Sequence, residues 1–100
     1  MIRQGDVMLV PVERGGVKAK DAREAGRIVL AHGEVSGHAH VVESIDADFY
    51  ETVEGERFLS APQGGTLVHD EHATLTIPAG TYRVIRQREY SPLEIRNVAD

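Results

Sequence analysis

The chain contains no cysteine and no tryptophan, and it has no long apolar run. Without cysteine there is no disulfide, no thiolate metal site and no cysteine nucleophile, so any bound metal must be held by nitrogen and oxygen. A membrane-spanning helix needs about 18 or more apolar residues in a row, and the first residues lack the layout of a signal peptide. We therefore expect a cytoplasmic protein that does not enter a membrane.

Basic residues are also scarce: 11 Lys and Arg stand against 16 Asp and Glu, a formal net charge of -5. Nucleic-acid affinity depends largely on clustered Lys and Arg that release counterions, so this balance argues against a nucleic-acid partner. One face of the last expected strand does combine aromatic and guanidinium groups, namely Tyr82, Arg86, Arg88 and Tyr90. They form a candidate interaction surface, and the alternative is a charged strand edge that blocks pairing.

The chain does contain a series of short segments rich in β-formers and separated by turn residues. They are residues 2–12, 27–31, 35–43, 48–53, 57–61, 66–69, 74–77 and 81–89. Turns recurring about every ten residues are typical of antiparallel barrels and sandwiches. We predict one all-β domain over residues 1–100, a small antiparallel β-barrel or sandwich of about seven or eight strands that forms a homo-oligomer by pairing its edges.

Two segments depart from this pattern. Residues 14–26 are rich in glycine and charge, which predicts a long loop, or a loop with a weak helical turn around 19–25. Near the end of the chain, Ser91 stands at an N-cap position, followed by Pro92 and by Glu94 at the third helical position. This capping-box layout predicts a short C-terminal helix over residues 92–98.

Four of the five histidines fall into two tight groups. These are His38-Ala39-His40 and, at a turn between two expected strands, His69-Asp70-Glu71-His72. Side chains two apart on a strand share a face, so His38 and His40 present their imidazoles together. A third ligand from His72 would give a three-histidine site with an open position, as catalytic metal sites have.

The cofactor that this pattern predicts is a divalent metal, namely Zn, Mn, Fe or Ni. His69, Asp70 and Glu71 would orient the ligands or replace one of them. If the site is catalytic, the metal would polarise a substrate oxygen or activate water. Two alternatives stay open: a metal-free cluster for a small-molecule ligand or acid–base work, and a solvated polar patch with no function.

Gly33, His38-x-His40 and the later Pro78-x-Gly80 resemble the two short motifs of the cupins. Cupins are small β-barrels that typically hold a divalent metal through histidines and a glutamate. The remaining ligand positions of that pattern are not matched here. The resemblance therefore implies a metal held by His38 and His40 and leaves the other ligands open.

Two further resemblances concern longer stretches. The strings HGEVSGHAH (residues 32–40) and GTYRVIRQREY (residues 80–90) resemble a family of small uncharacterised bacterial and phage proteins, which implies no activity. The first strand, the loop at 14–26 and Ile28-Val29-Leu30 resemble the ten-kilodalton co-chaperonin, which offers such a tripeptide to a protein partner. The competing function is thus a non-enzymatic accessory or interaction module that works through this loop or the last strand.

Overall fold

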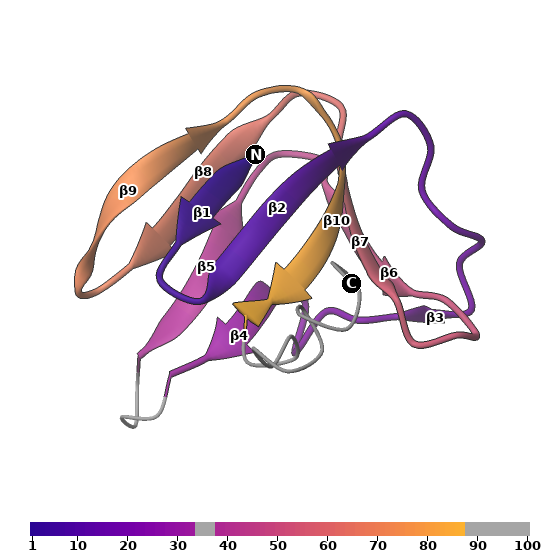
Figure 1. Cartoon of the computed structure of the whole chain (residues 1–100), viewed down its shortest axis with the longest axis horizontal. Helices are drawn as coiled ribbons and strands as arrows, with labels where there is room; N and C mark the ends of the chain where they lie inside the picture. Colours follow the sequence, from indigo (N-terminus) through magenta and orange to yellow (C-terminus); the bar gives the residue numbers. More distant parts are fainter. Residues whose placement is uncertain (34–37, 88–100) are drawn as a thin grey trace, which may run out of the picture.

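The computed structural model describes residues 1–33 and 38–87, which contain ten strands in two antiparallel sheets (Figure 1). The first sheet has the order β1 (Ile2–Gln4), β2 (Val7–Val12), β10 (Gly80–Arg86), β7 (Arg57–Ala61), β6 (Asp48–Glu51) and β3 (Lys20–Asp21). The second has the order β4 (Ile28–His32), β5 (Ala39–Glu43), β8 (Gly65–His69) and β9 (His72–Ile77). The all-β prediction is confirmed.

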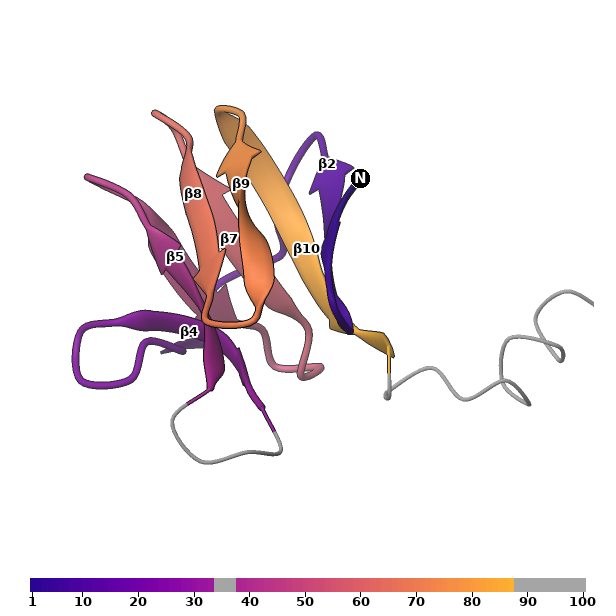
Figure 2. The same ribbon diagram turned by 90° about the vertical axis from the view of Figure 1, so that its left-hand side faces the viewer.

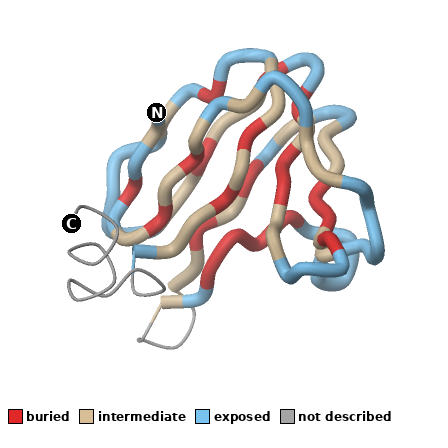
Figure 3. Tube along the Cα trace, turned by 45° about the vertical axis from the view of Figure 1, so that its right-hand side comes forward, coloured by how far each residue is buried: buried red, intermediate tan, exposed pale blue. Residues whose placement is uncertain are grey.

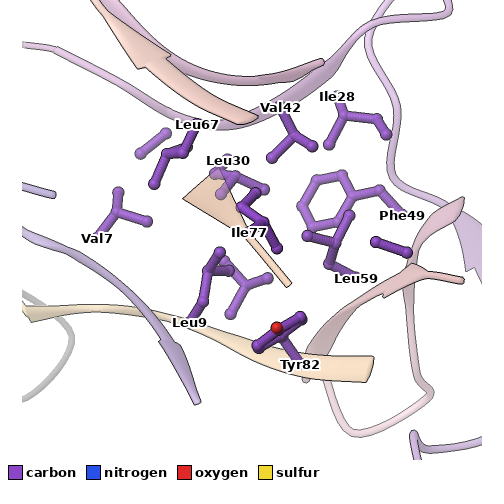
Figure 4. Close-up of a cluster of buried hydrophobic side chains, with 13 residues drawn as sticks. Val7, Leu9, Ile28, Leu30, Val42, Phe49, Leu59, Leu67, Ile77 and Tyr82 are labelled. Carbon is purple, nitrogen blue, oxygen red and sulfur yellow. The ribbon is translucent and has the colours of Figure 1, made fainter. Parts of the chain in front are cut away.

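The two sheets face each other across a shared apolar core. In Figure 2, β5, β8 and β9 lie on one side and β2 and β10 on the other. Because side chains alternate between the faces of a strand, each sheet sends every second residue inward, and buried and partly exposed positions alternate along several strands in Figure 3. The side chains labelled in the core (Figure 4) are Val7, Leu9, Ile28, Leu30, Val42, Phe49, Leu59, Leu67, Ile77 and Tyr82.

The observed strands match the expected segments closely, with one informative exception at the start. Residues 2–12 are a hairpin instead of a single strand, because β1 folds back on β2 with Ile2 opposite Leu9. Gly5 is the first residue of the two-residue turn and has a φ of +58°, which suits glycine and a type II′ turn. This turn, together with the short β3, raises the number of strands in the described residues above the predicted seven or eight.

The segment at residues 14–26 is a loop, as predicted, and it carries a short strand where a helical turn was the alternative. Lys20 pairs with Glu51 of β6, and the backbone N–H of Ala22 donates to the carbonyl of Phe49 over 2.9 Å. The predicted helix at 92–98 lies outside the described residues. Within the described residues, no helix is long and apolar enough to cross a membrane.

Candidate histidine site

Four histidine rings meet near the turn between β8 and β9. Figure 1 shows this turn at one end of the two sheets. The ring centroids of His40 and His69 are 4.3 Å apart, those of His69 and His72 4.7 Å, and those of His40 and His72 5.8 Å. His38 reaches this triad through His69, with 5.9 Å between the centroids. The two histidine groups of the sequence therefore form one cluster, which we call the histidine cluster.

The register of the strands explains why the rings meet. β5 pairs with β8 so that Val41 lies opposite Val68, and the antiparallel order then brings the preceding residue of β5, His40, next to His69. His69 pairs with His72 across the two-residue turn between β8 and β9. Long-range pairing thus joins two groups that are far apart in the sequence.

The histidine cluster lies at the edge of the apolar core, next to its buried side chains. His40 lies two residues before buried Val42 on β5, and His69 lies two residues after buried Leu67 on β8, so each histidine shares the inward face of its neighbour. His40 is itself buried, with an exposed fraction of 4%. The apolar layer between the sheets therefore ends in imidazoles at this edge.

The turn between β1 and β2 covers the histidine cluster from the other sheet. Gln4 is buried, and its side-chain Nε2 donates hydrogen bonds to the carbonyls of Leu67 and Ala73 over 3.0 and 2.9 Å. The amide oxygen Oε1 must then be the acceptor that lies 2.9 Å from Nδ1 of His40. His40 therefore donates through Nδ1–H, and its Nε2 carries the lone pair.

Burial keeps His40 neutral. The pKa of this imidazole is lowered from 6.5 to about 4, mainly because the ring is removed from water and also because of the neighbouring His69, while Asp6 opposes the shift. At neutral pH the ring is thus an uncharged base. The Oδ1 atom of Asp6 lies 3.6 Å from Nε2 of His40, and the other carboxylate oxygen of Asp6 lies 3.3 Å from Nη2 of Arg86.

Hydrogen bonding also constrains the other rings. The backbone N–H of Glu71 donates to Nδ1 of His69 over 3.0 Å, so a neutral His69 carries its proton on Nε2. Nδ1 of His38 lies 2.5 Å from a carboxylate oxygen of Glu71 at the rim of the cluster. The fifth histidine, His32, is exposed and pairs with Glu24 at 2.7 Å.

Gly5 leaves the space in which the rings lie. A Cβ atom at this position would be 2.9 Å from Nε2 of His72 and 3.2 Å from Cε1 of His40. The first distance is shorter than real Cβ contacts allow. Glycine is thus favoured by the positive φ, and a Cβ atom here would also displace the ring of His72.

The predicted site residues divide as follows. The structure brings together His38, His40, His69, His72 and Glu71. Asp70 instead lines a cavity of about 150 Å³, which it shares with His69. A larger cavity of about 410 Å³ is lined by none of the histidines. Among the described residues, no group of three or more His, Asp or Glu side chains has an arrangement that could hold a metal ion.

The candidate surface on the last strand differs from the prediction. Tyr82 is buried in the core, and its hydroxyl donates to the carbonyl of Pro78 over 2.7 Å. Arg86 pairs with Asp6 beside the histidine cluster. Arg88 and Tyr90 lie outside the described residues. Tyr82 and Val84 are both buried, so the face that carries them points into the core. β10 is also not a strand edge, because it lies between β2 and β7.

Sequence reasoning missed Gln4 and Asp6, whose side chains contact His40. A signal for them existed: Gly5-Asp6 is a turn dipeptide within the apolar stretch at residues 2–12. The turn was hidden because the stretch has apolar residues on both faces, as a single buried strand would. That the turn lies over the histidines follows only from the packing of the two sheets.

Comparison with protein-family models gives a match to the family described as Domain of unknown function (DUF8820), over residues 3–87. This range includes the β1–β2 turn and all four histidines of the cluster. Neither the curated proteins nor the solved structures give a significant match. The family match agrees with the resemblance to small uncharacterised proteins, whereas the cupin and co-chaperonin resemblances stay predictions.

Proposed function

Since the chain belongs to this family of domains of unknown function, its activity has to be argued from the site, and we propose that the histidine cluster binds a divalent transition-metal cation through His40 and His72. The observation that carries the proposal is the hydrogen bond between Gln4 and His40. Histidines that bind metals usually donate their other ring N–H to a fixed acceptor, which orients the ring and fixes its tautomer. Gln4 does this for His40 before any metal is present.

The state of His40 also favours a cation. A metal binds the neutral imidazole, and a pKa of about 4 means that almost no proton competes for Nε2 at neutral pH. The buried ring is held by one hydrogen bond and by the neighbouring rings. Imidazole nitrogen suits Zn, Fe and Ni, three of the four ions predicted from the sequence, whereas Mn prefers oxygen ligands.

The ring spacing supports the same conclusion. Two imidazoles on a tetrahedral metal, with metal–nitrogen bonds of about 2.0 Å, have centroids about 5 Å apart. His40 and His72 are at 5.8 Å, and His72 is on the exposed end of a hairpin. Rotation of the His72 side chain can therefore complete the pair without a change in the backbone.

The other members of the cluster have supporting roles in this proposal. His69 accepts a hydrogen bond at Nδ1, so its Nε2–H is a donor to a water or oxygen ligand on the metal. His38, paired with Glu71, is the alternative ligand at the rim. If the metal has an open position, it would polarise a bound oxygen ligand or activate water.

The test uses tag-free protein, with metal content measured by mass spectrometry and Zn²⁺ affinity measured by calorimetry. His40→Gln keeps a donor for Gln4 but removes the ring lone pair, and we expect it to weaken binding by at least about 100-fold. His32→Gln is the matched control, because His32 is exposed and outside the cluster. Wild-type protein that binds none of the four metals would contradict the proposal and favour the interaction module.

A further inference from the structure

Asp6 and His40 present two basic atoms to the same space. Nδ1 of His40 is the donor to Gln4, so Nε2 carries a lone pair, and Oδ1 of Asp6 lies 3.6 Å from it. Two acceptor atoms at this distance repel each other unless a proton or a cation lies between them. The other side of the Asp6 carboxylate is already neutralised in part by Arg86.

The spacing is also that of two ligands on one metal. Two donor atoms bound tetrahedrally at about 2.0–2.1 Å are about 3.3 Å apart. The observed 3.6 Å between Oδ1 of Asp6 and Nε2 of His40 needs only a small side-chain movement to reach this value. Zinc sites commonly combine histidine nitrogen with a carboxylate oxygen.

We propose that Asp6 is the carboxylate ligand of this site, joining His40 and His72, and that Arg86 holds the carboxylate when no metal is bound. This inference rests on the proposed function. The ligand set would then come from both sheets, with Asp6 on the β1–β2 turn and the histidines on β5 and β9. Two histidines and one carboxylate leave an open position on a tetrahedral ion, which a water or an anionic oxygen ligand fills.

Arg86 makes the ligand role of Asp6 testable. Its Nη2 lies 3.3 Å from Oδ2 of Asp6 and 3.3 Å from the carbonyl oxygen of His32, and its positive charge stands near the proposed cation. Removing this charge takes away one partner that competes for the carboxylate and reduces repulsion of the metal. A metal ligand and its competing partner therefore have opposite effects on affinity when each is replaced.

The experiment measures Zn²⁺ affinity by calorimetry for wild type, Asp6→Asn, Arg86→Gln and the control Asp48→Asn. Asp48 forms a comparable ion pair with Lys18, at 3.3 Å. We expect Asp6→Asn to weaken binding by roughly 10–100-fold, Asp48→Asn to leave it unchanged, and Arg86→Gln to strengthen it several-fold. Circular dichroism of the metal-free proteins checks that each variant folds.

The outcomes separate the two proposals. If wild type binds Zn²⁺ and Asp6→Asn binds equally well, Asp6 is not a ligand, and the metal site on the histidines stands. If Asp6→Asn and Arg86→Gln both weaken binding, the ion pair only positions the turn, and the ligand role is overturned. If wild type does not bind, the proposed function fails and the inference fails with it.

Discussion

Oε1 of Gln4 and Nδ1 of His40 lie 2.9 Å apart, although the residues are 36 positions apart in the sequence and belong to different sheets. The same amide donates to two carbonyls of the four-stranded sheet, those of Leu67 and Ala73. Gln4 thus uses both ends of its side chain to join the sheets and to fix one imidazole. The same hydrogen bonds therefore stabilise the fold and orient His40 in the proposed site.

The first prediction follows from this set. Gln4→Leu should lower the free energy of unfolding by about 1–3 kcal/mol, because buried partners of the amide lose their hydrogen bonds. Zn²⁺ affinity should fall by roughly 10–100-fold, since the tautomer of His40 is no longer fixed. Urea unfolding and calorimetry measure the two effects. Gln63→Leu, which removes only an exposed hydrogen bond to Asp46, is the control and should change neither quantity.

A second prediction concerns pH. The pKa of His40 is about 4 in the folded protein and near 6.5 in the unfolded chain, so the unfolded chain binds the proton more readily in this window. The contribution of His40 to the free energy of unfolding is fully present above about pH 6.5 and is lost as the pH falls toward 4. The loss amounts to roughly 3 to 4 kcal/mol at most, at about 1.36 kcal/mol per unit of pKa.

Urea unfolding with a chelator present, compared between wild type and His40→Gln, measures this loss. Other groups titrate in both proteins, so the difference between the two pH profiles isolates His40. We expect the wild type to lose more stability than the variant between pH 6.5 and 4. Parallel profiles would show that the imidazole is not held neutral by the fold.

A third prediction separates the two reasons for glycine at position 5. Gly5→Ala meets the ring of His72 at 2.9 Å and also has an unfavourable positive φ. Gly26 has a similar backbone, with a φ of +78°, but open space where a Cβ would lie. Both substitutions should cost about 1 kcal/mol or more of stability for backbone reasons. Only Gly5→Ala should also weaken Zn²⁺ binding and shift the NMR signals of the histidine rings.

The strands, and the position of His40 on one of them, could be predicted from the sequence because both depend on local pattern. β-Formers and turn residues mark the segments. The period of two predicts that His38 and His40 share one face, but β5 begins at Ala39, and His38 reaches the cluster through the ring of His69. The contact between His40 and His69 could not be predicted, because it depends on the pairing of β5 with β8. The sequence does not show which strands pair or in which register.

Gln4 and Asp6 could not be assigned to the site because their contacts cross between the sheets. No spacing in the sequence connects the β1–β2 turn to residue 40. The last strand shows the complementary problem: its period of two was correct, but the side facing the core was not evident, so buried Tyr82 was predicted as surface. Local pattern gives the faces of a strand, and only packing decides which face is inside.

The last prediction concerns stability with metal bound. A cation held by His40 and His72 on one sheet and by Asp6 on the other binds the folded protein and not the unfolded chain, so it stabilises the fold by mass action. At free Zn²⁺ of about 100 times the dissociation constant, the gain is about 2.7 kcal/mol. For a domain of this size, this corresponds to a rise of roughly 10 °C or more in Tm. Differential scanning calorimetry should show the rise for wild type and His32→Gln and its loss in His40→Gln. A rise that persists in His40→Gln would mean that Zn²⁺ stabilises the fold from another place, and the histidine cluster would no longer explain it.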